Sequence, residues 1–491
     1  MSWISENLIH RGSSRVSCRG RGLLWCIATA FFCSTTTADY RFDWRRSVEL
    51  GVRSESLGEY HDAALLYRHA INCILEHEDR TAADNINAGR TLARLARTYI
   101  RVSDGQSSTR VIEEARAIVA EFDEVPIRLN IELSLAECDL LKSEGKLNEA
   151  IQLILDAQRL ITKVDVDDDL EVQVHVTAAI THRLRGELRL ALQNAELAMH
   201  KVTQSQEPST LQTADVYFEL GVIHGSRGDY NKSLELLLKS REIISEGAAH
   251  PPRLLSIDIQ IAKLHVVFGD LLKARDSIEN ASKSFRHDRM RTHTRYFDLL
   301  YAQSIIYAKL QDWERAISAC KDLDRHLSNT TICRDLHIEN LHNLAYLMHQ
   351  IGDSESSIDY CDRAVQSIEN RLPTNAPVWG HKLFDVAIVY CRLGEHDAAI
   401  DSLEMALEVF ESCDGQLDYH LQTLNGLVRL KTKSGALSDA EKDVERLSLA
   451  VKNLPEEEVV EKLGPEINEV LQLWAKLREK QRMSVQESSS D

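Results

Sequence analysis

The sequence of residues 217–240 is YFELGVIHGSRGDYNKSLELLLKS. It places a turn-forming marker, Gly228-Asp229-Tyr230-x-x-Ser233, between two segments in which apolar residues recur at helical spacing. A glycine at this point favours the left-handed backbone conformation that ends a helix. The stretch therefore predicts a helix, a tight turn and a second helix packed against the first.

Related markers recur along the chain, and successive copies begin alternately 41 and 42 residues apart. An earlier copy begins at Gly58, and the interval after it has room for one more unit, whose degenerate marker is expected near Gly105. The eight copies in phase begin at Gly145, Gly186, Gly228, Gly269, Gln311, Gly352, Gly394 and Gly435. A period held this closely indicates an array of about ten helix pairs.

Small residues accompany the markers at fixed distances. Most copies have a small residue seven positions before the marker and another twelve positions after it, as Gly221 and Ser240 are placed around Gly228. Small side chains let two helices approach closely where they cross. The prolines fall mainly between repeats, where helices are expected to begin or end. We therefore predict an all-α fold over residues 39–450, a right-handed α-solenoid of stacked antiparallel helix pairs.

The pattern resembles the tetratricopeptide repeat, with Tyr217-x-x-Leu220-Gly221 through Ser240 as the best copy. The period is longer than the 34 residues usual in that family. Leu or Tyr replaces the early tryptophan, and the closing proline is often missing. The long period is similar to the variant in kinesin light chains and in bacterial regulators with long helical arrays. The resemblance implies stacked helix pairs and a concave surface that binds a protein or peptide.

Composition supports this class of fold. The chain has 491 residues, more than a single core usually holds, and only 8 prolines and 21 glycines, too few for the many turns of an all-β protein. Its net charge of -18 argues against binding of nucleic acid through a positive field. Seven widely spaced cysteines follow Ala38, without a C-x-x-C pair, and they are expected to be core residues rather than a disulfide framework.

Residues 1–38 have the layout of a secretory signal. Four arginines precede an apolar run from Leu23 to Cys33, and small residues follow up to Ala38. Cleavage after Ala38 would make the protein secreted or periplasmic, and N-terminal sequencing would test this. The alternatives are a transit peptide and a misplaced start codon upstream of a cytoplasmic protein. The run is too short to span a membrane, and no other stretch is apolar enough.

The C-terminal region has a different pattern from the repeats. Residues 451–482 contain apolar residues at helical spacing, including Ile467, Leu471 and Trp474, among many Glu and Lys residues. This predicts a capping helix at the end of the array. Residues 483–491 are expected to form a disordered tail.

The sequence has none of the common catalytic or phosphate-binding motifs, so we expect no enzyme activity, no cofactor and no metal site. His182, His224 and His265 each lie four residues before a marker in consecutive units. Neighbouring repeats stack about 8–10 Å apart, too far for three rings to share one ion. We interpret these histidines as filling the space between the two helices of a unit.

The first helix of each unit presents a ladder of side chains at positions ten and six residues before the marker. Between about residues 218 and 388 this ladder is apolar and aromatic, with basic residues bordering it. It is interpreted either as a face buried against neighbouring helices or as a groove for an apolar or amphipathic peptide. The predicted partner-binding residues are Phe218, Ile259, Tyr301, Ile305, His342, Tyr346, Phe384, Ile388, Lys309 and Arg392.

These observations favour a non-catalytic scaffold that binds a protein or peptide along its concave face. The Lys and Asn ladder with which some relatives hold the carboxylate of a chaperone tail is absent, which excludes that partner. The alternative is a regulatory module that senses a small effector and acts through a separate output protein. The oligomeric state is left open.

Overall fold

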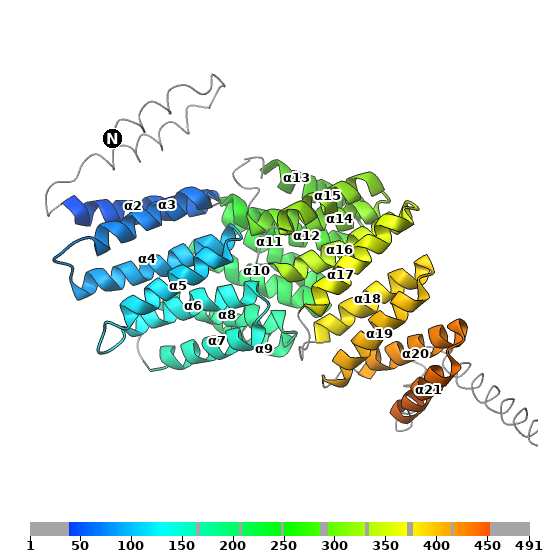
Figure 1. Ribbon diagram of the computed structural model, residues 1–491. Coiled ribbons are helices and arrows are strands. Elements are labelled where there is room, and N and C mark those ends of the chain that lie inside the picture. The colour runs from blue at the N-terminus through cyan, green and yellow to red at the C-terminus, as the bar shows by residue number, and fades with distance from the viewer. Residues whose placement is uncertain are drawn as a thin grey trace, which may run out of the picture. The chain divides into compact units, whose positions relative to one another are not determined.

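A computed structural model describes residues 39–163, 167–205, 209–246, 250–284, 293–328, 333–370, 377–413 and 417–451. Every regular element in these ranges is an α-helix, and the helices form ten consecutive pairs (Figure 1). The predicted leader, most of the capping helix and the tail lie outside the described residues. Within the described part, no helix combines the length and apolarity that crossing a membrane would require.

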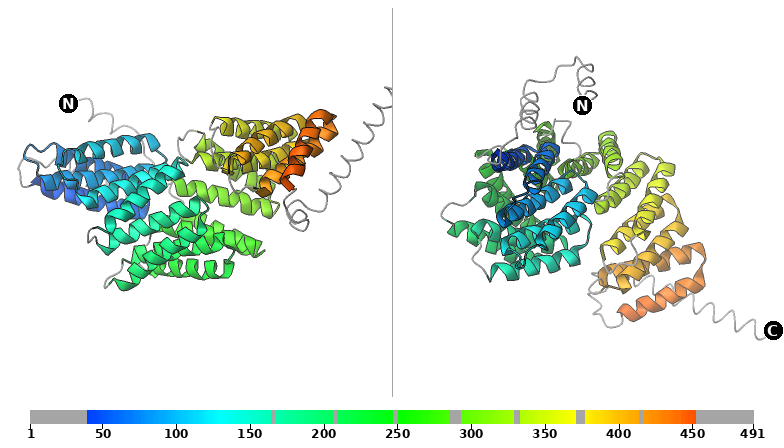
Figure 2. Two further views of the ribbon diagram at one scale, coloured as in Figure 1. Left: turned by 90° about the horizontal axis from the view of Figure 1, so that it is seen from below. Right: turned by 60° about the vertical axis from the view of Figure 1, so that its left-hand side comes forward.

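The helices divide into two compact units, with the boundary close to Gln212 inside α10. Unit 1 consists of four helix pairs, which Figures 1 and 2 colour from blue to cyan-green. Its helices are α2 (Asp39–Leu57), α3 (Tyr60–Leu75), α4 (Ala82–Arg101), α5 (Gly105–Val119), α6 (Ile127–Ser143), α7 (Leu147–Ile161), α8 (Asp168–Leu184) and α9 (Leu188–Gln204).

Unit 2 contains the remaining six pairs, coloured from green to orange-red in the same figures. Its helices are α10 (Thr210–Ser226), α11 (Tyr230–Glu246), α12 (Pro251–Val267), α13 (Leu271–Ser284), α14 (Thr294–Lys309), α15 (Trp313–Leu327), α16 (Arg334–Gln350), α17 (Ser354–Glu369), α18 (Pro377–Leu393), α19 (His396–Glu411), α20 (Leu417–Ser434) and α21 (Leu437–Val451). The even-numbered member of each pair is its first helix.

The turns between paired helices have the predicted backbone conformation. All eight marker glycines have a positive φ, between 79° and 87°, and Gln311 reaches 59° without being a glycine. In the unit with the degenerate marker, Ser103 takes the left-handed position with φ 64°, and Gly105 is instead the first residue of α5. Because Ser103 lies 42 residues before Gly145, this unit keeps the repeat period.

In eight of the ten pairs an acid follows the marker residue, directly before the second helix; Lys146 and Ala436 take this place in the other two. Asp104, Asp312 and Asp353 are N-cap residues whose carboxylates accept a hydrogen bond from a backbone N–H in the first turn. Glu59 and Glu395 occupy the same position and make no such bond. The extra methylene of Glu moves its carboxylate away from the N–H groups that the shorter Asp reaches, so Asp is the better cap here.

The two helices of a pair cross at the small residues. In the α10–α11 pair, the Ser233 hydroxyl donates a 2.6 Å hydrogen bond to the Gly221 carbonyl oxygen, and a Cβ on Gly221 would lie 2.9 Å from Leu237 Cγ. In the α16–α17 pair, Ser357 donates equivalently to Ala345 at 2.7 Å. The predicted close crossing is therefore confirmed, and a larger side chain at these positions would separate the helices.

The cysteines of the described part are all free thiols. Cys138, Cys320 and Cys361 are buried on helices, as predicted for small core residues, whereas Cys73, Cys333, Cys391 and Cys413 are half-buried. Burial raises the pKa of Cys320 and of Cys361 to about 12. These two thiols therefore stay protonated and unreactive at neutral pH.

Candidate partner-binding surface

The predicted ladder residues all lie on first helices of unit 2. Phe218 is on α10, Tyr301 on α14 and Phe384 on α18, and each of these rings is half-buried. Ile305, His342 and Tyr346 are also half-buried, whereas Ile388, Lys309 and Arg392 are exposed. The structure thus places nine of the ten predicted residues where part of the side chain reaches solvent.

Ile259 is different, and its assignment to a binding surface is corrected. Its side chain is 2% exposed and packs in the core between α12, α13 and α14, where it belongs to one cluster with Leu299 and Ile306. An aliphatic side chain covered in this way stabilises the fold and offers no area to a partner. At this repeat the alternative interpretation, a face buried against neighbours, is the correct one.

Tyr301 lies at the centre of a mixed polar and aromatic cluster. The Lys263 ammonium on α12 is 6.0 Å from the centroid of its ring, within the range of a cation–π interaction. Burial raises the pKa of the Tyr301 hydroxyl, and the nearby Glu339 carboxylate raises it further. Glu339 also pairs with Lys382 at 2.9 Å. Four successive first helices, α12 to α18, therefore contribute to one connected surface.

His342 lies in the same part of this surface. Burial lowers the pKa of its imidazole, Asp385 opposes the shift, and Lys382 adds to it. The imidazole is therefore neutral at pH 7 and can both donate and accept a hydrogen bond. We call the surface formed by Phe218, Lys263, Tyr301, Ile305, Glu339, His342, Tyr346, Lys382, Phe384, Asp385 and Ile388 the first-helix face.

Sequence reasoning missed the charged members of this face. Glu339, Lys382 and Asp385 lie thirteen, twelve and nine residues before their markers, and only positions ten and six were considered for the ladder. A first helix exposes positions three or four residues apart on one side, so including position thirteen would have found Glu339. The face is amphipathic rather than purely apolar.

An aromatic cluster adjoins the face at Phe384. Tyr419 on α20 meets the Phe384 ring edge-on at 5.9 Å between centroids, and it stacks on Phe410 of α19 at 5.7 Å. His381 lies 4.1 Å from the Tyr419 ring centroid. Gly380 permits this packing, because a Cβ there would lie 2.6 Å from Phe410 Cε1. The cluster holds Phe384 in place while leaving part of its ring exposed.

The three histidines assigned to inter-helix filling behave differently from one another. The His182 Nδ1 lies 2.7 Å from the Glu187 carboxylate, and the His224 Nδ1 lies 3.1 Å from the Asp229 carboxylate. In both repeats the imidazole connects the first helix to the acidic residue that precedes the second helix. His265 is half-buried, with its Nδ1 covered and without a hydrogen-bond partner. Among the described residues, no group of three or more His, Cys, Asp or Glu has the arrangement of a metal site.

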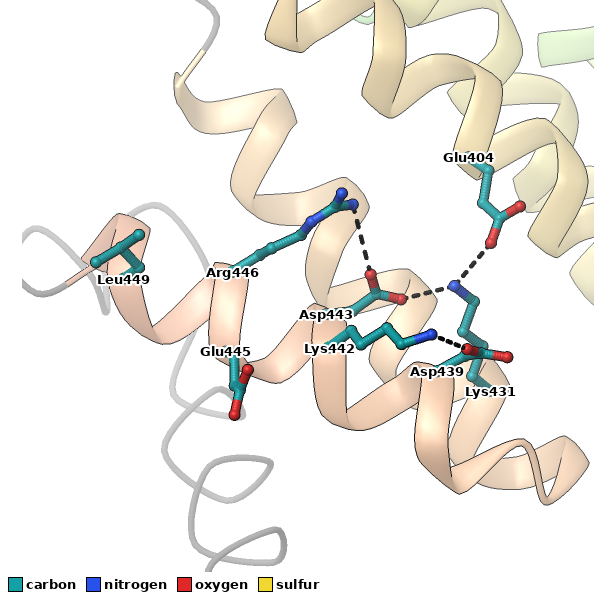
Figure 3. A pocket seen from close by; sticks show the side chains of 8 residues that line it. All are labelled: Glu404, Lys431, Asp439, Lys442, Asp443, Glu445, Arg446 and Leu449. Carbon is teal, nitrogen blue, oxygen red and sulfur yellow. Dashed lines mark hydrogen bonds and ion pairs between the residues drawn. The ribbon is translucent and has the colours of Figure 1, made fainter.

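One pocket lies outside the first-helix face, at the last helix pair. It has a volume of about 670 Å³ and is lined mainly by charged residues (Figure 3). The buried Lys431 ammonium contacts Asp443 of α21 and Glu404 of α19, each at 2.7 Å. Lys431 occupies the position that Tyr307 and Tyr390 fill in earlier pairs. The pocket therefore surrounds an ion pair that joins three helices.

A second pocket of about 250 Å³ is lined by Leu238, Arg241, Asp258, Ile261, Ser277 and Asn280. The Arg241 Nε and the Asp258 carboxylate are 2.8 Å apart across it. Pockets that enclose small-molecule ligands usually have volumes of about 300–1,000 Å³. This one is smaller than that range, whereas the charged pocket around Lys431 falls within it.

No family model matches this sequence, and no curated protein matches it. Solved structures resemble it at low identity. A Rap protein complexed with Competence and Sporulation Factor is 13% identical, with a TM-score of 0.49, and the match covers 76% of this chain and 98% of that one. The apo quorum sensor NprR from B. thuringiensis is 11% identical, with a TM-score of 0.48, over 73% of this chain and 97% of that one.

A Signal Transduction ATPase with Numerous Domains protein with a tetratricopeptide repeat sensor, from Pyrococcus horikoshii, is also similar. It is 14% identical, with a TM-score of 0.41, and the match covers 71% of this chain and 52% of that one. Likenesses at this level concern the fold alone. The periodic turns and the ten helix pairs themselves show that the described part of the chain is a tetratricopeptide-like helical-repeat array.

Proposed function

We propose that the chain is a non-catalytic scaffold that binds a partner protein or peptide on the first-helix face of unit 2. The observation that carries this proposal is the half-buried row of Phe218, Tyr301 and Phe384, which recur at one repeat position. Each ring keeps some surface for a partner, while its buried part is held by the core. Aromatic side chains fixed in advance lose little entropy on binding and often provide the main anchors of an interface.

The charged residues of the face define the kind of partner that fits. Glu339 and Lys382 form an ion pair in its middle, and Lys309 and Arg392 lie exposed at its border. A purely apolar segment would bury this pair without replacing its contacts with water, which is costly. The partner is therefore an amphipathic segment with apolar anchors and polar groups between them, bound as a helix or as an extended strand.

Selection of binders from a random peptide library against the full chain tests the proposal. Ile388→Asp should weaken the selected peptides tenfold or more, because it places a carboxylate in an apolar contact. Ile388 is 39% exposed, so this change should leave the fold intact. Leu197→Asp in unit 1 changes a similarly exposed leucine and should leave the affinity unaltered.

Tyr301→Ala separates the two interpretations of the ladder. If the face binds the peptide, this variant should bind tenfold or more weakly and melt at nearly the same temperature. If Tyr301→Ala unfolds the protein and Ile388→Asp still binds normally, the face is core. Peptides that bind both folded variants at full strength would show that the partner uses another surface.

A further inference from the structure

The turn between α12 and α13 has an apolar residue at a position where the other repeats have a polar one. Three residues after the marker, this repeat has Leu272, which is 61% exposed. The other nine repeats have a polar residue there, namely His61, Gln106, Asn148, Arg189, Asn231, Glu314, Glu355, Asp397 and Ser438. An exposed leucine that replaces a consistently polar residue is unfavourable in water and points to a covered state.

Three further apolar side chains surround this position. Val267, two residues before the marker, is 53% exposed, although most repeats have a polar or basic residue there. Phe268 and Tyr230 are each 39% exposed, and their rings meet edge-on with centroids 6.5 Å apart. Tyr230 belongs to the preceding repeat, so two adjacent turns form one apolar surface. We call Tyr230, Val267, Phe268 and Leu272 the turn patch.

Unpaired cations lie at the turns on both sides of the turn patch. Arg227 precedes the marker of the α10–α11 pair, and Lys309 precedes that of the α14–α15 pair. Both are exposed, and neither forms an ion pair with any described residue. By contrast, Lys273 beside the patch already pairs with Asp270 at 3.0 Å. The carboxylates of these turns, Asp229, Asp270 and Asp312, already contact His224, Lys273 and Arg315. Three consecutive turns therefore present an unpaired cation, an apolar surface and a second unpaired cation.

We propose that the turn patch docks an extended segment of a partner protein in which apolar residues lie between two acidic residues. Successive helix pairs stack about 10 Å apart, so the two cations are separated by about 20 Å. An extended chain covers that distance in about six residues. The apolar residues would supply most of the affinity, because exposed ion pairs contribute little, and the acids would set the direction of the segment.

This site shares Lys309 with the border of the first-helix face, but its apolar residues lie at the turns and those of the face lie along the helices. The site also selects for the sign of the charge on its partner. Arg227 and Lys309 attract carboxylates, so a segment with the same apolar residues between two lysines would be repelled. The charge of the flanking residues therefore offers a direct way to test the assignment.

The test uses the full chain and a fluorescein-labelled peptide, Gly-Glu-Ser-Phe-Leu-Ser-Ser-Glu-Gly, with binding followed by fluorescence anisotropy. The double variant Val267→Ser with Leu272→Asn installs the residues that the preceding repeat has at the same positions, Ser226 and Asn231. It should fold normally and bind at least tenfold more weakly. Leu65→Asn changes a leucine of unit 1 that is 64% exposed, and it should bind the peptide like the original chain.

Charge reversal completes the experiment. Arg227→Glu with Lys309→Glu should weaken the acidic peptide and strengthen a peptide with Lys in place of both Glu residues. Tyr301→Ala should leave the affinity unchanged, which separates this site from the first-helix face. The proposal is overturned by absence of binding up to about 1 mM, by equal binding of the acidic and lysine peptides, or by full binding to the Val267→Ser, Leu272→Asn variant.

Discussion

The first helices of units 1 and 2 carry different chemistry at the same repeat positions. Six residues before the turn, two of the four repeats of unit 1 have Arg97 and Asp139, joined across adjacent repeats at 2.7 Å, and the other two have Val52 and Ile180. Unit 2 has Ile305, Tyr346 and Ile388 at that position, with surface still open to solvent. The repeat fixes where a side chain points, and the residue type decides whether it contacts its own neighbours or remains available to a partner.

Twelve or thirteen residues before the turn, both units have ion pairs between adjacent repeats, such as the Glu339–Lys382 pair of unit 2. Arg90 of α4 pairs with Glu132 of α6 at 2.9 Å, and Arg128 one turn away adds a second contact to that carboxylate. The polar groups on this face of unit 1 therefore satisfy one another. In unit 2 the first helices also carry aromatic side chains, Tyr301 and Phe384 among them, that keep surface open to solvent, which is why we place the binding surface there.

The largest loss of unfolding free energy is expected at the helix crossings, which have the same small residues in both units. Ala316→Phe in unit 2 and Ala150→Phe in unit 1 each replace a fully buried alanine at the helix crossing. Overpacking should cost about 1–3 kcal/mol of unfolding free energy in either case. Hydrogen exchange should show the loss of protection first in the altered repeat and its neighbours, around residues 293–328 for Ala316→Phe, because a repeat array is stabilised by nearest neighbours.

The two overpacking variants serve as controls for each other. Ala150→Phe should leave the exchange of α14 and α15 unaltered, and Ala316→Phe should leave that of α6 and α7 unaltered. Uniform loss of protection along the described chain in either variant would contradict the division into two separately stabilised units.

The next effect concerns the ion pairs of unit 1. Asp139→Ala leaves Arg97 and the largely buried Lys142 without their shared carboxylate, and it should destabilise the chain by about 2 kcal/mol in urea unfolding. Ile305→Ala, at the same position in unit 2, should cost less because its side chain is only half-buried. Equal costs would contradict the view that the unit 1 face is stabilised by its own charges.

The ion pair at Asp139 also predicts a pH dependence. Burial alone would raise the pKa of Asp139, but Lys142 and Arg97 outweigh it and hold the pKa well below its ordinary value. Its contribution to stability is therefore present above the unfolded-state pKa of about 4 and is lost as the pH falls through the lower folded-state pKa. Urea unfolding from pH 5 downward should show a loss of stability that Asp139→Ala reduces.

His342 of unit 2 should respond to acid at a higher pH than Asp139 does. Because burial lowers the pKa of this imidazole, the unfolded chain takes up its proton first, near pH 6.5, and stability falls as the pH drops below that value. Lys382 favours the neutral ring, while Asp385 and Glu339 oppose it. His342→Gln should reduce the loss of stability between pH 7 and pH 5. His349→Gln on the same helix is the control, and an equal reduction there would contradict the assignment.

The repeat architecture could be predicted because the turns leave a periodic mark in the sequence. Gly228 and its equivalents favour a positive φ, and Ser233 or alanine is needed at the helix crossing, so the small residue is present in all ten copies and the glycine in eight. The burial of Ile259 could not be predicted, since it depends on how α13 and α14 pack against α12. The pair formed by Glu339 and Lys382 depends in the same way on the register of adjacent repeats.

The smallest expected change in unfolding free energy gives the most direct test of the difference between the first helices of units 1 and 2. Ile388→Ala removes an exposed aliphatic side chain from the position that Asp139 occupies in unit 1, and it should change the unfolding free energy by less than about 0.5 kcal/mol. An open binding surface must tolerate this change, because the exposed part of its side chains does not stabilise the free protein. If Ile388→Ala costs as much as Asp139→Ala in urea unfolding, the first-helix face of unit 2 is stabilised by its own contacts, as that of unit 1 is, and the contrast between the two faces fails.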